Sequence, residues 1–266
     1  MTSAEETLHI AIAQPPMAWT TDENVARIVA VLVAAAGQGA TLCVFPELAL
    51  TGFHRGIREQ ATPAIVAAAI ERVRSACREN AIACALGAPT FAGEDRVRNS
   101  YLVIDCAGEI VSTVSKNGLT PAELTFFEPG TDRAVHRFAG RACTTVLCRE
   151  IDDVESIARQ LDAAPADLIF WPSIVGSPPG TIHPTQEDTD DPGYLKRTAT
   201  LARRLAAFVV QSNWPNALNT PDRTHLGESK VYAPDGEVLL TLPRDEPGFG
   251  VFALGERRFR WTGLAA

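Results

Sequence analysis

Apolar runs and helical patterns alternate along the first third of the chain. Three short runs are nearly continuously apolar, which is typical of strands buried on both faces. These runs are residues 8–13, 41–45 and 81–87. Between them, apolar residues recur at the spacing of one helix face, from about Asn24 and again after Thr62-Pro63, a pair typical of a helix start. The order strand, helix, strand, helix, strand predicts a buried sheet that carries helices on one face or both.

Hairpin signals and further strands continue this pattern through the rest of the chain. Turn sequences at residues 105–109 and 234–237 separate short apolar runs and predict two β-hairpins. Further elements are predicted as strands at 141–147, 168–171 and 208–212 and a helix over 154–161. Residues 174–193 are rich in Pro, Gly and Asp and predict a long loop. Because no linker is recognisable, we expect residues 1–266 to form a single domain of two β-rich halves with helices outside.

Composition places the chain among globular proteins and disfavours one class of partner. Of the 266 residues, 46% are hydrophobic and 21% are charged, which is enough apolar material for a sizeable core. The net charge of -8 argues against a nucleic-acid partner, because phosphate neutralisation needs clustered Lys and Arg. The densest basic group, Arg257, Arg258 and Arg260, is expected to be a solvated tail or a subunit contact.

The sequence predicts neither a membrane segment nor a metal site. No apolar run approaches the roughly 18–20 residues of a membrane span. Residues 1–6 are polar and acidic, unlike a signal peptide, so we expect a cytoplasmic protein whose thiols stay reduced. The six cysteines form no C-x-x-C pair, which disfavours a zinc ribbon or a redox motif. We therefore expect most cysteines to be small core residues.

Three residues with reactive side chains directly follow predicted strands. Glu47, Lys116 and Cys148 occupy such strand ends, where loops on a rigid scaffold commonly carry ligand sites. A thiolate can attack a carbonyl carbon, a carboxylate can take the thiol proton, and an ammonium group can stabilise the negative charge that develops. These three groups suffice for acyl transfer. Position alone leaves the alternatives open: a helix-start or surface carboxylate, a solvated lysine and one more core cysteine.

The segments around these three residues resemble the catalytic motifs of the nitrilase superfamily. Residues 44–53 pair a strand-end proline and glutamate with a downstream glycine and aromatic residue. Residues 115–130 place a lysine before a leucine, a second glutamate, an aromatic residue and a glycine. Residues 146–150 end an apolar strand in Cys, one variable residue and an acidic residue. Further similar segments span nearly the whole chain, at residues 10–14, 166–173, 209–213 and 227–229.

The resemblance implies a fold and the roles of several residues. The fold is expected to be α/β, a four-layer α-β-β-α sandwich that usually dimerises, so we expect a homodimer or a higher homo-oligomer. Cys148 is expected to be the nucleophile and Glu47 the general base and acid. Lys116 and the backbone N–H of Arg149 are expected to stabilise the tetrahedral intermediate, and Glu123 matches the glutamate that orients the substrate or the lysine. The Arg149 side chain stands where many relatives carry an aromatic or small residue, and it is expected to help position the substrate.

Two loops are expected to line the substrate pocket. Phe53 follows the glutamate motif and Trp171 precedes the long loop, and both are expected to position the substrate. His54 and His183 either contact the substrate or are exposed loop histidines. The acidic residues of segment 187–191 either favour a cationic amine leaving group or belong to a solvated loop.

The resemblance implies a hydrolase that cleaves a non-peptide carbon–nitrogen bond through a cysteine thioester and requires no metal and no organic cofactor. Small amides, carbamoyl amides and nitriles are the candidate substrates, and an amidase is favoured over a nitrilase. One alternative is a non-catalytic binding or scaffold protein on the same fold, and another is an acyltransferase that uses the same three residues. A serine hydrolase is disfavoured because no G-x-S-x-G segment is present.

Overall fold

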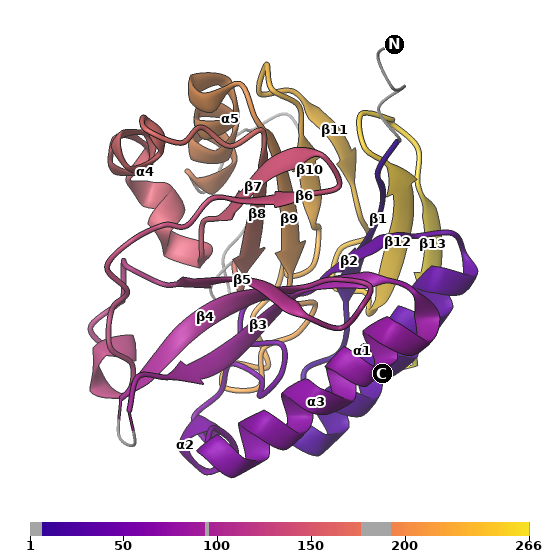
Figure 1. Ribbon diagram of the computed structural model, residues 1–266, viewed down its shortest axis with the longest axis vertical. Helices are drawn as coiled ribbons and strands as arrows, with labels where there is room; N and C mark the ends of the chain where they lie inside the picture. Colours follow the sequence, from indigo (N-terminus) through magenta and orange to yellow (C-terminus); the bar gives the residue numbers. More distant parts are fainter. Residues whose placement is uncertain (1–6, 94–95, 177–192, 266) are drawn as a thin grey trace.

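The computed structural model describes residues 7–93, 96–176 and 193–265 of the chain. Its strands form two sheets that pack face to face, and helices cover the outer face of each sheet (Figure 1). The layers are therefore helix, sheet, sheet and helix. The predicted α/β class and the four-layer α-β-β-α sandwich are confirmed.

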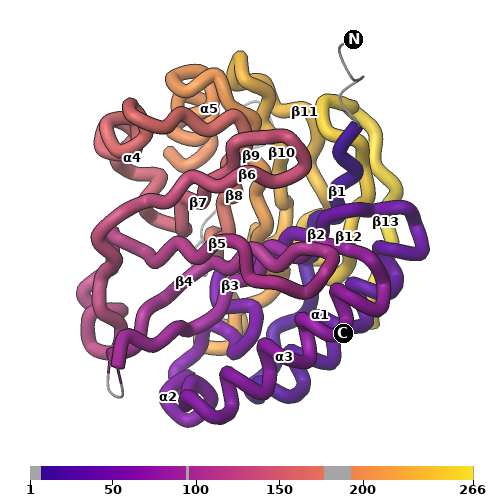
Figure 2. The backbone as a smooth tube through the Cα atoms, in the orientation of Figure 1, coloured from indigo at the N-terminus to yellow at the C-terminus, as the bar shows by residue number. Residues whose placement is uncertain are grey.

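The first sheet mixes parallel and antiparallel pairs. Its strands are β1 (His9–Gln14), β2 (Leu42–Val44), β3 (Ala83–Phe91), β4 (Val97–Ile104), β5 (Ile110–Ser115), β12 (Gly248–Ala253) and β13 (Arg260–Gly263). Their order across the sheet is β13-β12-β1-β2-β3-β4-β5. β1, β2 and β3 are mutually parallel, and β3, β4 and β5 form an antiparallel meander. The backbone trace in Figure 2 shows β12 and β13 returning to lie beside β1, to which β12 is paired.

The second sheet has a parallel centre. Its strands are β6 (His136–Phe138), β7 (Arg141–Thr145), β8 (Leu168–Ser173), β9 (Phe208–Asn213), β10 (Lys230–Tyr232) and β11 (Val238–Thr241). Their order is β11-β10-β9-β8-β7-β6, and β7, β8 and β9 run parallel. The carboxyl ends of these three strands therefore lie at one edge of the sheet.

The helices divide between the two outer faces. They are α1 (Thr21–Gly37), α2 (Ile57–Gln60), α3 (Pro63–Asn80), α4 (Val154–Leu161) and α5 (Tyr194–Leu205). α1 and α3 lie side by side over the first sheet, and α4 and α5 cover the second (Figure 1). None of the helices in the described part of the chain is long and apolar enough to span a membrane.

Three apolar cores hold the layers together, and the alternation of side chains along β1 shows how. Ala11 and Ala13 face the core under α1 and α3, while Ile10 and Ile12 face the core between the sheets. Successive residues of a strand point to opposite faces, so a strand that is apolar at every position serves two cores at once. The third core lies under α4 and α5.

Helix starts follow the chemistry of their capping residues. Thr62 caps α3, and Pro63 is its first residue, as predicted. α1 begins at Thr21, three residues before the expected Asn24, because the Thr20 hydroxyl accepts a hydrogen bond from the Glu23 backbone N–H. The polar first turn hides this start from a reading based on apolar periodicity.

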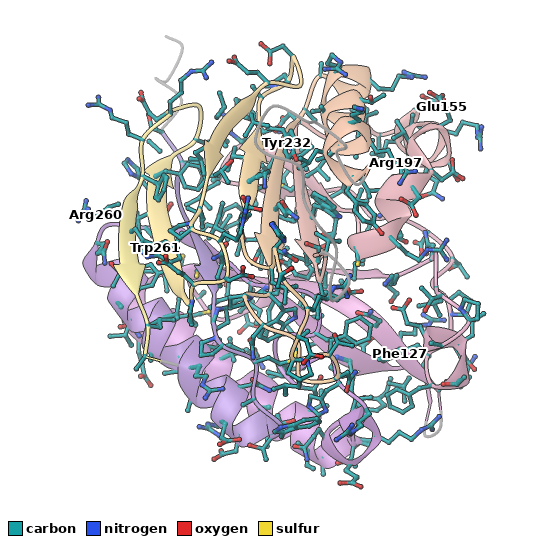
Figure 3. The ribbon with its side chains drawn as sticks, turned by 180° about the vertical axis from the view of Figure 1, so that it is seen from behind. Phe127, Glu155, Arg197, Tyr232, Arg260 and Trp261 are labelled. Carbon is teal, nitrogen blue, oxygen red and sulfur yellow. The ribbon has the colours of Figure 1, made fainter. Side chains whose placement is uncertain are left out.

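The basic group near the C-terminus is not a solvated tail. Arg260 and Trp261 belong to β13, the edge strand of the first sheet (Figure 3). Arg257 pairs with Glu237 of the hairpin that joins β10 and β11. The prediction of a tail is therefore wrong, because backbone pairing with β12 orders this segment.

Candidate active site

Lys116 contacts two carboxylates in the interior of the protein. It directly follows β5, and its Nζ lies 2.7 Å from Glu47 Oε1 and 2.6 Å from Glu123 Oε1. The Lys116 and Glu47 side chains are 1% and 0% exposed. The alternatives of a solvated lysine and a surface carboxylate are therefore wrong. Removing one partner from such a buried group of charges leaves an uncompensated charge, which costs about 3–5 kcal/mol.

Glu47 is held in a tight turn after β2. The next residue, Leu48, has a φ of 52°. The carbonyl oxygen of Glu47 accepts a 2.8 Å hydrogen bond from Trp214 Nε1. Oε1 accepts hydrogen bonds from Lys116 and, at 2.8 Å, from Asn99 Nδ2. Oε2 is buried and has no hydrogen-bond partner among the described residues. This oxygen is the one that has free capacity to accept a proton.

Cys148 begins the helical turn that follows β7. Its φ of 46° lies in the left-handed region, which costs a non-glycine residue on the order of 1–3 kcal/mol. Trp171 Nε1 donates a 2.9 Å hydrogen bond to the Cys148 carbonyl oxygen, and the backbone N–H of Ile174 contacts its sulfur. The surrounding structure therefore fixes both the backbone and the thiol of this residue.

Burial and charge set the protonation of these groups. Burial and the charge of Glu47 raise the pKa of the Cys148 thiol to about 12, while Lys116 opposes the shift. Burial also raises the pKa of Glu47, against the opposing effect of Lys116 and with a further rise from Glu123. Burial alone lowers the pKa of Lys116, but the carboxylates and Cys148 outweigh it and the net shift is upward. At neutral pH the thiol is therefore protonated and the lysine is charged.

The side chains of Glu123 and Arg149 both form hydrogen bonds to the peptide group that joins Leu119 and Thr120. Glu123 Oε2 accepts a 2.8 Å hydrogen bond from the backbone N–H of Thr120. Arg149 Nη1 donates to the carbonyl oxygen of Leu119 at 3.2 Å, which is the other end of the same peptide. The segment after Lys116 is thus connected to the residue that follows Cys148.

Glu150 joins the same two segments more strongly. Its carboxylate accepts hydrogen bonds from the backbone N–H groups of Leu147 at 2.7 Å, Asn117 at 2.6 Å and Gly118 at 3.2 Å. It also pairs with the buried Arg133 at 3.2 Å. One carboxylate therefore fixes the turn that carries Cys148 against the segment that carries Lys116.

The other predicted site residues differ in how deeply they are buried and in what they contact. Phe53 is half-buried and packs beside Leu48. Trp171 is fully buried and contacts the backbone of Cys148, so its contact with substrate stays a prediction. His54 is 3% exposed, and both ring nitrogens bond to the backbone of its own loop, so the expectation of an exposed histidine is wrong. His183 and the acidic segment 187–191 lie outside the described residues.

Sequence reasoning missed Asn99, Glu150 and Trp214. Asn99 carried a usable signal, because it is a polar residue at a fully buried position inside β4. Glu150 was noted only as the acidic end of a motif. Trp214 follows β9 in the second sheet, and its contact with Glu47 crosses between the sheets. No local pattern reports such a contact.

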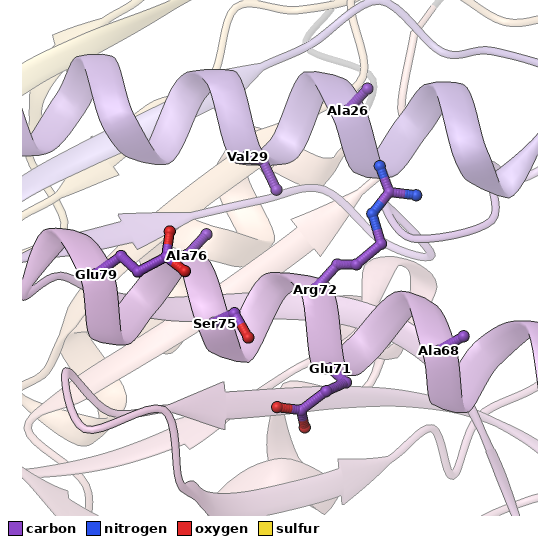
Figure 4. A pocket seen from close by; sticks show the side chains of 8 residues that line it. All are labelled: Ala26, Val29, Ala68, Glu71, Arg72, Ser75, Ala76 and Glu79. Atoms are coloured by element: carbon purple, nitrogen blue, oxygen red, sulfur yellow. The ribbon is translucent and has the colours of Figure 1, made fainter.

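A separate open groove crosses the outer helices. It has a volume of about 680 Å³ and is lined by α1 and α3, with alanines and the charged residues Glu71, Arg72 and Glu79 along its walls (Figure 4). It contains none of the reactive residues described above. Among the described residues, no three His, Cys, Asp or Glu side chains are grouped to hold a metal ion.

Comparison with known proteins identifies the family. The chain matches the carbon-nitrogen hydrolase family over residues 9–255 and belongs to that family. Three solved structures of an amidase from Nesterenkonia, described as a nitrilase-superfamily member, share the fold. A cysteine-to-alanine mutant is 22% identical with a TM-score of 0.81, covering 95% of this chain and 92% of that chain. The unmutated amidase is 24% identical with a TM-score of 0.80 and the same coverages.

The third structure is a glutamate-to-glutamine mutant of the same amidase. It is 22% identical with a TM-score of 0.81, and the alignment covers 96% of this chain and 92% of that chain. It shows covalent addition of the acetamide moiety of fluoroacetamide at that protein's active-site cysteine. No curated protein matches this chain significantly.

Proposed function

We propose that the protein is an amidase that hydrolyses small amides through a thioester on Cys148. The observation that carries the proposal is the buried contact of Glu47, Lys116 and Glu123, whose charges act on the Cys148 thiol. A base, a fixed cation and a protonated thiol are the groups that acyl transfer needs.

Acylation begins with a protonated thiol. The Cys148 sulfur attacks the amide carbon while Glu47 takes its proton, and the carbonyl electrons move to oxygen. A carboxylate with a raised pKa suits this task, because a base is most effective when its pKa lies near the working pH. Such a positioned base contributes about 10²–10⁴-fold to the rate.

Lys116 and the backbone N–H of Arg149 stabilise the oxyanion of the tetrahedral intermediate. One such donor is worth roughly 10²–10³-fold in kcat. The intermediate then collapses as the carbon–nitrogen bond breaks, and Glu47 gives its proton to the departing nitrogen. Ammonia or an amine leaves, and a thioester remains on Cys148.

Deacylation repeats these steps with water. Glu47 takes a proton from water as the oxygen attacks the thioester carbon, and the carbon–sulfur bond then breaks. The proton returns to the sulfur and the carboxylic acid leaves. We favour an amide over a nitrile substrate because the similar solved structures are those of an amidase. In one of them an acetamide group is attached to the active-site cysteine of that amidase.

A screen for ammonia release from small amides, carbamoyl amino acids and nitriles tests the proposal. Turnover of amides is expected, and Cys148→Ala is expected to lose it. Cys143→Ala is the matched control, because Cys143 is also buried, also has a pKa raised to about 12 and lies in β7 just before the nucleophile. It is expected to keep its activity.

Three other outcomes would contradict the proposal. Equal turnover by Cys148→Ala would exclude this cysteine as the nucleophile. Release of ammonia only when an amine acceptor is added would indicate an acyltransferase. No turnover of any substrate by a folded protein would favour a binding or scaffold role.

A further inference from the structure

Two arginines beside the nucleophile have no carboxylate partner among the described residues. Nearby arginines are paired: Arg133 with Glu150, and Arg197 of α5 with Asp152 at 2.7 Å (Figure 3). For Arg149 and Arg223, by contrast, no carboxylate of the described residues lies within ion-pair distance.

Arg149 lies on the side of the nucleophile that faces the lysine segment. It directly follows Cys148 in the chain and is only partly exposed. Its one hydrogen bond runs to the neutral carbonyl oxygen of Leu119, at 3.2 Å. The guanidinium group has five N–H donors, so most of its capacity is left for a ligand.

Arg223 lies on the other side, against the segment that follows β8. Its Nη2 donates to the carbonyl oxygen of Gly176 at 2.9 Å, two residues beyond the Ile174 N–H that contacts the Cys148 sulfur. Its Nε is buried and has no hydrogen-bond partner among the described residues. A buried charged donor without an acceptor is costly, and it indicates a group that a ligand completes.

Tyr194 at the start of α5 connects these groups. Its pKa is raised by burial, then by the charges of Cys148 and Asp152, and it is lowered by Arg223 and Arg197. Tyr194 is itself half-exposed, so this region opens towards solvent.

We propose that Arg149 and Arg223 bind a carboxylate of the substrate, so that the preferred substrates are amides that also carry an anionic group. This inference rests on the proposed amidase function and names its substrate class. Arginine binds carboxylates through paired N–H donors, with a stronger interaction than neutral hydrogen bonds give. These two cations, which have no ion-pair partner within the described part of the chain, also counter the repulsion that an anion meets from a protein of net charge -8.

Succinamate and succinamide provide the test, because they differ only in the exchange of a carboxylate for an amide of the same shape. The quantity measured is kcat/KM for succinamate divided by kcat/KM for succinamide, from ammonia release. The wild-type protein is expected to prefer succinamate. Arg149→Gln and Arg223→Gln are each expected to lower this ratio about tenfold or more, the effect of losing one charged hydrogen bond.

Arg137→Gln is the matched control. Arg137 is exposed on β6 and also donates to a backbone carbonyl oxygen, that of Gly140, but it lies away from the nucleophile turn. Its ratio is expected to equal that of the wild type. Because each ratio compares two substrates on one protein, a general loss of activity in a variant does not change it.

Two results would overturn the inference. One is a wild-type preference for succinamide. The other is a ratio that stays unchanged in both arginine variants. Turnover of neutral amides alone would exclude the anionic substrate class but would be consistent with an amidase. No turnover of any amide would exclude the amidase function itself.

Discussion

At the scale of single residues, the site depends on one ammonium group shared by two carboxylates. Lys116 lies within 2.7 Å of an oxygen of Glu47 and within 2.6 Å of an oxygen of Glu123. Because the site is buried, the carboxylate that is less well compensated is easier to protonate. Glu123 is further held by the Thr120 N–H, whereas Glu47 keeps one oxygen without a partner. Burial raises the pKa of the Glu47 carboxyl, and its oxygen without a partner among the described residues can accept the proton.

The pH dependence of kcat/KM follows from these shifts. Glu47 acts as a base only when ionised, and its pKa is raised, so activity is lost as the pH falls through a value above that of an ordinary carboxyl group. At alkaline pH, the raised pKa of Lys116 keeps its charge, and we expect no loss up to about pH 10, where an ordinary lysine titrates. A pH profile of kcat/KM measures both limbs, because it reports the free enzyme.

A different profile would contradict this account. If the reaction required a thiolate formed before attack, activity would rise through the alkaline range towards the Cys148 pKa of about 12. A profile that rises steadily above neutral pH would therefore exclude Glu47 as the group that takes the proton during attack.

At the scale of elements, turns at strand ends place the reactive groups. The turn after β2 passes so close to β3 that only a glycine fits opposite it. A Cβ on Gly87 would lie 2.2 Å from the Leu48 backbone nitrogen and 2.5 Å from the Pro46 carbonyl oxygen. The position of the base thus depends on a missing side chain in the neighbouring strand.

Replacing that glycine is expected to displace the base. Gly87→Ala forces backbone to move, and overpacking of this kind costs about 1–3 kcal/mol. A shift of the base by about 1 Å lowers kcat by about 100-fold. Urea unfolding and amidase assays measure the two effects. Gly37→Ala, at the end of α1, is the control: its added Cβ would meet no other part of the protein within 4 Å, so the variant is expected to keep its activity and to lose no stability. Equal activity in both variants would show that this close contact does not position Glu47.

Periodicity predicted most elements, and its failures have physical causes. β12 has glycines at two alternate positions, Gly248 and Gly250. A Cβ on Gly248 would lie 2.2 Å from the Trp261 ring. Gly248 makes room for that ring and Gly250 for the Leu242 side chain, and the two glycines also remove the apolar pattern by which a strand is recognised. β13 was missed because Arg260 and the arginines just before it are typical of a solvated surface, although an edge strand exposes such side chains normally.

At the scale of the whole molecule, the site is assembled from both sheets. Glu47 and Lys116 follow β2 and β5 of the first sheet, whereas Cys148 follows β7 of the second. The sequence supplied the residue types and the strand ends, and the family resemblance supplied their roles. Sequence reasoning could not show that these residues lie close together, because their proximity depends on how the two sheets pack. Contacts such as that of Trp214 with the Glu47 carbonyl exist only after that packing.

The acyl group on the enzyme is the most direct test of this chemistry. The protein is quenched in acid while it turns over an amide, digested, and analysed by mass spectrometry. The account predicts the substrate's acyl group on the peptide that contains Cys148, removable by hydroxylamine. Cys106, the exposed cysteine, is the natural site of unspecific modification and is expected to stay free. Ammonia release without any acyl group on Cys148, or with the group on Cys106 instead, would contradict the account.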